Sequence, residues 1–201
     1  MPDISELAQK FKGTYDIAGL GEAIYQSEVG KTFRWTMEGN DLCEAATLNQ
    51  FHAVRRMCCY EFVHFVAYLT SEQKTSDTGH LLLGPGAGNA YTSQNYTVWD
   101  RESDIPRGKV VVGVARAFNN TSGYYHVGIS LGNGRIVSLS GDVNLHIKSV
   151  GDLFSRLGYS EVRIADYNWR TSQAVPGPAA APVAPVASAG VAAVGSPGRS
   201  K

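Results

Sequence analysis

The sequence predicts a single α+β domain in which helices come first and an antiparallel sheet follows. Apolar residues recur at helical spacing within residues 5–12, 16–28, 42–54 and 58–69. From Gly108 onwards the pattern changes to short β-branched runs separated by turn residues. The chain has 201 residues, of which 43% are hydrophobic and 18% charged. This is an ordinary globular composition, and the length suits one well-filled core.

Turn and capping residues separate the predicted helices. Gly13 divides the first two helices, and residues 31–37 alternate in polarity, which predicts a short strand. Asp41 followed by Glu44 has the spacing of a capping box and marks the start of the third helix. Residues 80–107 are rich in Gly, Asn, Ser and Thr, so we expect a long loop before the sheet begins.

The C-terminal half contains the strands of an expected antiparallel meander. These strands cover residues 109–117, 124–131, 135–140, 144–148 and 161–167, and a helical turn covers residues 150–157. Gly132, Asn133 and Gly134 together are a strong hairpin signal. We expect these residues to form a three-residue loop that pairs Leu131 with Arg135.

Composition excludes several functional classes. Lys and Arg together number 18, as do Asp and Glu, so the chain has no net charge with which to attract nucleic acid. The three cysteines, Cys43, Cys58 and Cys59, are an odd number and lack the paired spacing of zinc ligands. We therefore expect free thiols, no metal ion and no cofactor.

The N-terminus is examined for a targeting segment and the C-terminus for disorder. Residues 1–6 lack the basic and apolar regions of a secretory signal peptide. No apolar run reaches the roughly 18 residues of a membrane-spanning helix, so we expect no membrane span. Residues 172–201 are dominated by Ala, Pro, Val, Gly and Ser and predict a disordered tail. The folded domain is expected to span residues 1–171.

Cys59 and His126 have the sequence context of a thiol nucleophile and its base. A free thiol has a pKa of about 8.5 and supplies little thiolate at neutral pH. Cys59 lies in the first turn of a predicted helix, just after Arg55 and Arg56, so both the helix dipole and these charges favour the thiolate. His126 lies near the start of a predicted strand, and an imidazole close to the sulfur would complete the activation.

Three segments resemble motifs of the NlpC/P60 superfamily of papain-like cysteine peptidases and occur in that family's order. Residues 59–63 (CYEFV) resemble the C-x-G-F-V start of its nucleophile helix. Residues 107–112 (RGKVVV) resemble its P-G-D-L-V-F strand. Residues 126–137 (HVGISLGNGRIV) closely resemble its H-V-G-I-Y-L-G-N-G strand, turn and strand. The resemblance covers residues 55–148.

The resemblance implies both a fold and an activity. Cys59 would be the nucleophile and His126 the general base and acid, in a papain-like fold whose helices pack on a small antiparallel sheet. Members of the family typically cleave amide bonds in bacterial cell-wall peptides, often γ-D-glutamyl linkages, and need no metal. We therefore expect a cysteine amidase or endopeptidase whose substrate is a peptidoglycan stem peptide.

The surroundings of the nucleophile depart from the family pattern. The family usually has Asp-Cys-Ser-Gly, whereas residues 58–61 read Cys-Cys-Tyr-Glu. The oxyanion hole would use the backbone N–H of Cys59 and one upstream donor. The family's usual upstream Tyr has no clear match, and Asn49 and Gln50 are the substitutes that the sequence offers.

The residue that orients His126 is open between three candidates. The family's third catalytic residue falls at the position of Ser138, and a hydroxyl is a weak orienter. Asp142 has the charge that stabilises an imidazolium, and His146 lies just beyond it. Because the choice depends on the register of the hairpin, Ser138, Asp142 and His146 are equal candidates.

Two other residues have a sequence context that could place them in the site. Cys43 also lies in the first turn of a predicted helix, but Asp41 and Glu44 beside it would raise its pKa, so we expect a structural thiol. His64 lies on a different side of the helix from Cys59, so we expect a packed or interface residue there.

The expected biological setting follows from the missing signal peptide. The protein would be made in the cytoplasm and delivered by a contact-dependent machine, as an antibacterial toxin of type VI secretion that acts in a target cell's periplasm. An immunity protein would then be its partner. Two alternatives stay open: a papain-like deamidase, transglutaminase or protease effector that acts on a protein, and a catalytically degenerate module that binds cell-wall peptides or another protein.

Overall fold

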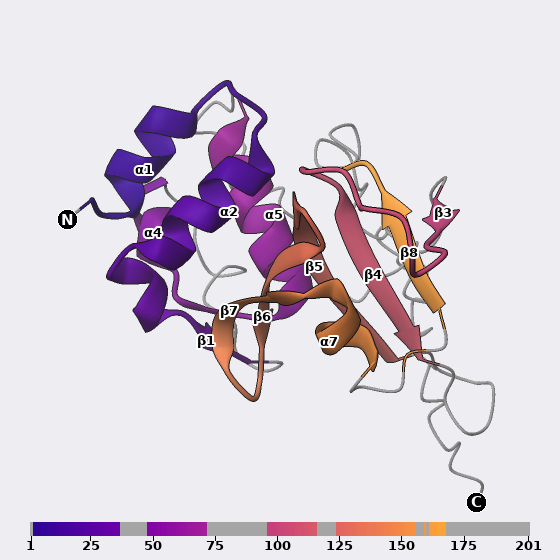
Figure 1. Ribbon diagram of the computed structural model, residues 1–201. Coiled ribbons are helices and arrows are strands. Elements are labelled where there is room, and N and C mark those ends of the chain that lie inside the picture. Colours follow the sequence, from indigo (N-terminus) through magenta and orange to yellow (C-terminus); the bar gives the residue numbers. More distant parts are fainter. Residues whose placement is uncertain are drawn as a thin grey trace, which may run out of the picture.

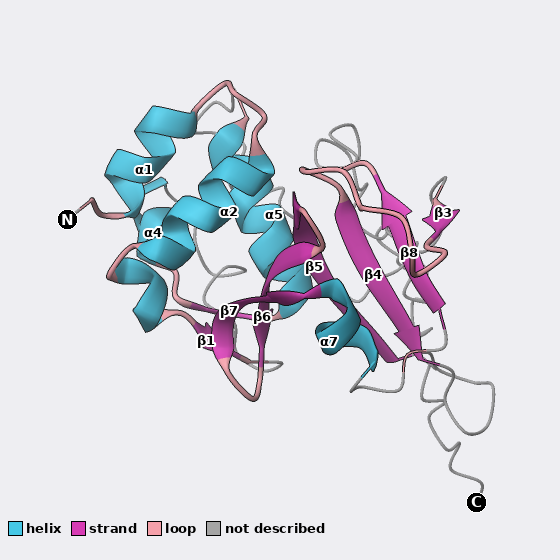
Figure 2. Cartoon of the chain, in the orientation of Figure 1, coloured by secondary structure: helices cyan, strands magenta, loops and turns pink. Residues whose placement is uncertain are grey.

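The computed structural model describes residues 2–36, 48–71, 96–115, 124–155, 159 and 161–167. Four helices gather on one side of the strands (Figures 1 and 2). They are α1 (Ile4–Phe11), α2 (Ile17–Gln26), α4 (Leu48–Ala53) and α5 (Cys59–Thr70). The predicted cap at Asp41, the Cys43 thiol and the predicted tail at residues 172–201 lie outside the described residues.

The sheet contains six described strands in the order β3-β8-β4-β5-β6-β7, and every neighbouring pair is antiparallel. The strands are β3 (Thr97–Val98), β4 (Val110–Ala115), β5 (Tyr124–Gly132), β6 (Arg135–Ser140), β7 (Asn144–Ser149) and β8 (Glu161–Ala165). The predicted α+β class is confirmed. The predicted meander is confirmed from β4 to β7, but β8 does not continue it: β8 returns to pair with β4, and β3, inside the predicted loop, pairs with β8.

The strand predicted over residues 31–37 is largely replaced by a turn. Val29–Thr32 forms the 3₁₀ helix η1, and only Arg34–Trp35 extends as strand β1. The hydroxyl and the carbonyl of Ser27 both accept the N–H of the residue three positions on, which holds the chain in the turn. Strand β1 pairs in parallel with β2 (Arg56–Met57), which leads directly into α5.

Helix α5 is the central helix of the core. Phe62, Phe65 and Val66 on it have no exposed surface, and the helix contacts α1, α2, β5 and β6. Alternate strand residues pack against this helical layer: Val110, Val112, Val127, Ile129, Val137 and Leu139. The intervening residues face the other side of the sheet, where α7 (Val150–Ser155) covers them with Leu153 and Phe154.

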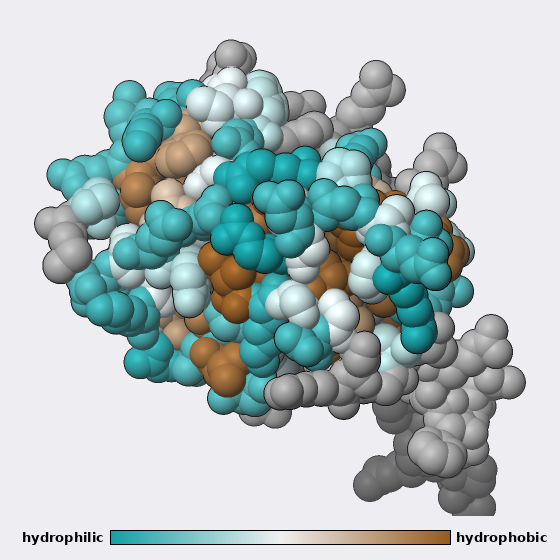
Figure 3. Space-filling model, in the orientation of Figure 1, coloured by the Kyte–Doolittle hydropathy of each residue, from teal (hydrophilic) through white to brown (hydrophobic). Residues whose placement is uncertain are grey.

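The surface carries few large apolar side chains. On the face seen in Figure 3, apolar areas are small and separated by hydrophilic residues. The exposed large apolar residues of the described chain are Tyr15, Tyr25, Tyr96, Val98 and Val143. Such scattered positions are normal for a folded domain, so the apolar residues serve mainly to build the two cores.

The β5–β6 hairpin turns on two residues rather than on three. Asn133 and Gly134 have φ angles of 52° and 66°, the positive values that a tight hairpin turn requires. Gly132 pairs with Arg135, so the predicted pairing of Leu131 with Arg135 is wrong. A bulge before the turn takes up the difference, and beyond it the register returns to the expected one.

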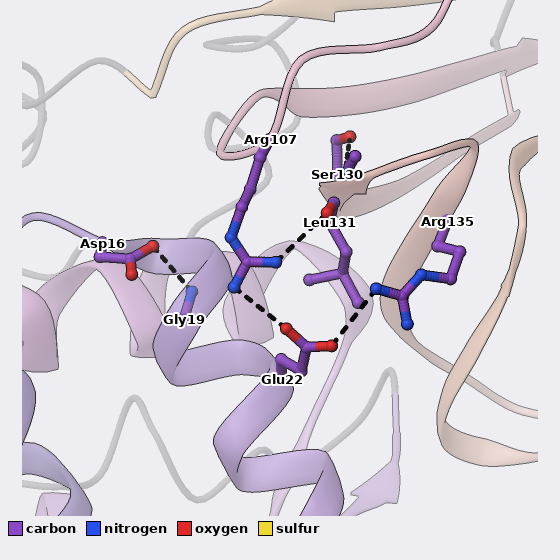
Figure 4. A network of polar contacts seen from close by, with 8 residues as sticks. Asp16, Gly19, Glu22, Arg107, Ser130, Leu131 and Arg135 are labelled. Atoms are coloured by element: carbon purple, nitrogen blue, oxygen red, sulfur yellow. Dashed lines mark hydrogen bonds and ion pairs between the residues drawn. The ribbon is translucent and has the colours of Figure 1, made fainter.

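A network of polar contacts ties the hairpin to the helices (Figure 4). The Glu22 carboxylate of α2 lies 3.0 Å from Nη2 of Arg107 and 3.5 Å from Nη2 of Arg135. Arg107 also donates a hydrogen bond to the carbonyl of Leu131 at 3.2 Å. Because both arginines lie near the hairpin turn, Glu22 holds the hairpin against α2.

Candidate active site

Cys59 is the first residue of α5. The preceding residue, Cys58, is the N-cap, and its N–H donates a hydrogen bond to the Glu61 carboxylate at 2.6 Å. This is the arrangement of a capping box, and it fixes where the helix begins. The free N–H groups of the first turn give this end of α5 a partial positive charge, which favours an anionic sulfur at Cys59.

His126 lies on β5 opposite Gly113 of β4. Its ring is buried, and it meets the Phe154 ring edge-on with the two centroids 6.4 Å apart. A side chain at Gly113 would place its Cβ 2.3 Å from the Phe154 ring. The missing side chain therefore lets Phe154 pack closely on the sheet and beside the imidazole.

The thiol and the imidazole meet where β5 and β6 separate. The two strands are paired from Gly132–Arg135 to Ile129–Val137, and the residues of β6 after that pair with β7. At this point the N–H of Val127 and the His126 side chain both lie near the Cys59 sulfur and favour its thiolate form. The early end of the strand pairing thus leaves room for the tip of α5 to reach the strand.

These contacts lower the pKa of the Cys59 thiol well below its ordinary value. The largest cause is a hydrogen bond from the Cys58 thiol. Burial acts in the opposite direction, whereas the hydrogen bond and charge of His126 and the N–H of Val127 favour the thiolate. The same bond raises the pKa of Cys58, so Cys58 stays a neutral donor while Cys59 carries the charge.

Ser138 fixes the protonation pattern of the His126 ring. Its hydroxyl lies 2.8 Å from Nε2 of His126 and 2.8 Å from the carbonyl oxygen of Val127. The single hydroxyl proton goes to the carbonyl, which can only accept, so Ser138 must accept a proton from Nε2. The other ring nitrogen, Nδ1, is then free to exchange a proton with the Cys59 sulfur.

Asp142 does not contact His126 in the described structure. Its carboxylate is exposed, accepts a hydrogen bond from Ser140 and lies 3.6 Å from Nζ of Lys148. The hydrogen bond from Ser140 is the largest of the causes that lower the pKa of Asp142. Of the three candidate orienters, Ser138 is therefore the one that bonds directly to His126.

His146 lies beside this group rather than in it. It pairs with Ser138 across β6 and β7, so both side chains are on the face that carries His126. Its Nδ1 lies 2.9 Å from the Asn144 carbonyl and 3.4 Å from the Ser140 hydroxyl. Burial is the largest cause that lowers the pKa of His146, and the charge of His126 acts in the same direction.

The reacting atoms keep only a narrow contact with solvent. Cys59 is 6% exposed and His126 is 5% exposed, whereas Ser138 is fully buried. Gln50, one of the two proposed upstream oxyanion donors, is exposed on α4, and the side chain of Asn49 lies outside the described residues. The upstream donor therefore stays a prediction.

The role of Cys58 could not be predicted from the sequence. In the sequence, the adjacent cysteines stand out only as a departure from the family pattern. His64 is packed, as expected: its Nδ1 lies 2.8 Å from the Tyr167 hydroxyl. Burial lowers the pKa of His64 to about 4.

Replacing Cys58 with alanine should raise the pKa of Cys59 towards its ordinary value, because the hydrogen bond that lowers it most is lost. Cys58→Ser is the matched variant, since a hydroxyl can donate the same bond and should keep the pKa low. The thiolate absorbance of each variant is titrated against that of its Cys59→Ala counterpart. Coincident titrations of Cys58→Ala and wild type would show that Cys58 has no such influence.

In the described part of the chain, no cluster of three or more His, Cys, Asp or Glu side chains could hold a metal ion. Within the same residues, none of the helices has the length and apolarity to cross a membrane. Comparison with known proteins adds no family assignment to this geometry: no protein-family model and no curated protein sequence matches the chain.

Proposed function

We propose that this protein is a cysteine hydrolase in which Cys59 is the nucleophile and His126 the general base and acid. The observation that carries the proposal is the contact between a helix-terminal sulfur with a lowered pKa and an imidazole from a strand far away in sequence. Ser138 serves as the positioning residue, because its hydroxyl holds the proton on Nε2 and leaves Nδ1 for the sulfur.

In the proposed reaction the Cys59 thiolate attacks the carbonyl carbon of an amide, and His126 holds the proton that left the sulfur. The N–H of Cys59, at the positive end of α5, is placed to stabilise the oxyanion. As the carbon–nitrogen bond breaks, His126 gives its proton to the leaving amine, and a thioester to Cys59 remains. His126 then takes a proton from water, whose oxygen attacks the thioester and releases the acid and the thiol.

The proposed substrate class is the stem peptide of peptidoglycan, within a papain-like fold of the NlpC/P60 kind. Support comes from the three motif segments in their family order, and from a nucleophile helix packed on an antiparallel sheet that carries the base. The proposed setting is an antibacterial effector delivered into a target periplasm, with an immunity protein as its partner.

The test is the release of soluble peptides from purified peptidoglycan, followed by mass spectrometry. Wild-type protein should release fragments with new amine and carboxyl ends, and Cys59→Ala should release none. His52→Ala is the matched control, because His52 is a half-buried histidine on α4, and it should act like wild type. Release by Cys59→Ala at the wild-type rate would refute the proposal.

The same experiment separates the chemistry from the substrate. If a thiol-directed probe labels Cys59 rapidly while peptidoglycan stays intact, the thiol chemistry holds and the substrate class is wrong. A candidate protein substrate would then be examined for a gain of about one dalton, the mass change of deamidation. If Cys59 reacts no faster than an ordinary thiol, the chain is a binding module instead.

A further inference from the structure

The direction of the His126 ring nitrogens is not fixed by local stereochemistry. Rotation about the bond from Cβ to the ring is broad in histidine, so neighbouring groups must hold the imidazole in one orientation. The partner of Nε2 is the Ser138 hydroxyl, which is neutral, and hydrogen bonds between neutral groups are roughly half as strong as those to an ionised group. A base anchored in this way needs further support from packing.

The ring of Phe154 packs against the imidazole from the side of the sheet away from α5. Val127 packs on the helical layer, so the preceding residue, His126, faces the opposite side, where α7 carries Phe154. The two ring centroids lie 6.4 Å apart and the ring planes cross at 61°, which is the geometry of an edge-to-face pair. Because Cys59 belongs to the helical layer, the imidazole has the nucleophile on one side and Phe154 on the other.

Gly113 makes the close approach of Phe154 possible. It lies directly opposite His126 in the register of β4 and β5, and a Cβ there would lie 2.3 Å and 2.4 Å from two carbons of the Phe154 ring. Gly113 is not one of the described glycines with a positive φ, so the backbone conformation does not require glycine. A glycine weakens the interior of a strand, and the space that it leaves here is taken by Phe154.

Phe154 is itself held in place. It is 3% exposed, and it meets the ring of Tyr159 with the centroids 5.4 Å apart and the planes at 76°. Tyr159 is also buried, and both residues belong to the apolar cluster under α7. An enclosed ring has little room to give way, so Phe154 resists any turn of the imidazole towards it.

We propose that Phe154 is a positioning residue of the proposed hydrolase, and that its ring holds the His126 imidazole in the orientation that leaves Nδ1 for the Cys59 sulfur. The inference rests on the proposed function, because it concerns the same thiol and the same base. Phe154 takes no part in proton transfer. It acts by limiting the rotation of His126, while Ser138 holds Nε2 and Gly113 leaves the space that the ring needs.

Loss of this ring should reduce the fraction of molecules in which the imidazole is directed at the sulfur. The reactivity of Cys59 at low pH then falls by the same fraction, because only the correctly oriented imidazole supports the thiolate. Well above the pKa of an ordinary thiol, the thiolate forms without the imidazole and the difference should disappear. A change confined to low pH therefore separates positioning from a general loss of structure.

The test needs no substrate: iodoacetamide alkylates the full chain at pH 6 and at pH 9.5, and fragment masses distinguish Cys59 from Cys58. Phe154→Val removes the ring carbons nearest to Gly113, so the rate at pH 6 should fall about tenfold. At pH 9.5 the rate should stay within about threefold of wild type. If Phe154→Val does not fold, Phe154→Leu takes its place.

The matched control is Leu153→Ala, which removes a buried side chain from the same helix and the same apolar cluster. Both variants should unfold at lower urea concentrations than wild type, but Leu153→Ala should keep the wild-type ratio of the rates at pH 6 and pH 9.5. An unchanged ratio in Phe154→Val would overturn the inference, as would an equal change in Leu153→Ala.

Gly113→Ala provides an independent test from the opposite strand. Its methyl group would displace the Phe154 ring, so the rate at pH 6 should again fall about tenfold. In the Phe154→Val background the methyl group has room and should lower the rate by no more than about threefold. Equal effects in both backgrounds would contradict the inference. A wild-type Cys59 that reacts no faster at pH 6 than an ordinary thiol would instead refute the proposed function, which is a separate outcome.

Discussion

His126→Ala is expected to lower kcat/KM for amide release by about 10³-fold or more at pH 7, because one side chain supplies both the base and the acid of the proposed reaction. It also removes the imidazole and its positive charge from the Cys59 sulfur, which should raise the pKa of the thiol. KM should change little, since the loss is of transition-state stabilisation. Initial rates of peptide release over a range of substrate concentrations measure both constants.

The activities of variants at neighbouring residues show whether the loss is specific to His126. Ser138→Ala should lose less activity than His126→Ala, because it removes only the group that holds the Nε2 proton. Adding His126→Ala to Cys59→Ala should have no further effect, since residues that act as a unit are not additive. If His126→Ala keeps a tenth or more of the wild-type kcat/KM, a different base must serve Cys59.

The second large effect concerns stability in acid and is centred on His64. Burial holds the pKa of this histidine at about 4 in the folded protein, below the ordinary value of 6.5 that it regains on unfolding. The unfolded chain therefore binds the proton first, and stability falls as the pH drops from 6.5 towards 4. A difference of this size corresponds to a loss of about 3 kcal/mol in the free energy of unfolding.

Urea unfolding of wild type and His64→Leu at pH 7 and pH 4 measures this contribution. His64→Leu loses the hydrogen bond to Tyr167, so it should be less stable at pH 7, but it should lose less stability on acidification because it has no proton to bind there. His52→Ala, which removes a half-buried ring from α4, should retain most of the wild-type pH dependence. Equal acid losses in wild type and His64→Leu would contradict the assignment.

Local periodicity was sufficient to predict where the helices and strands lie, but not which strands pair with each other. Strand β6 has the bounds that alternation predicts, and α5 is displaced by one residue at each end from the predicted helix. Neither pattern contains information about partners distant in sequence. The pairing of β8 with β4, and of Thr97–Val98 with β8, depends on which edge remains open after the other strands have assembled. Because this pairing depends on tertiary structure, it could not be predicted from local sequence patterns.

For the candidate site as well, individual residues could be predicted from the sequence, but the contacts between them could not all be predicted. The sequence identified Cys59 and His126 individually, and motif order suggested their contact. It could not choose between Ser138, Asp142 and His146, because a shift of one residue in the hairpin would turn every side chain of β6 to the other face. The two-residue turn alone would have caused such a shift, and the bulge before it cancels the effect. Cys58 was missed because a thiol that shares its proton has no spacing rule.

The separation of β5 from β6 at Ile129 also makes stability and chemistry depend on the same bonds. Val127 would ordinarily join the neighbouring strand through its amide and carbonyl, but here its carbonyl accepts the Ser138 hydroxyl and its amide lies near the Cys59 sulfur. The side chains of Cys59 and Ser138 thus take the place of the backbone partners that Val127 would have in a continuous sheet. A descendant that abandoned catalysis and lost these two side chains would also have to close its sheet again, so inactive relatives should show compensating changes along β5 and β6.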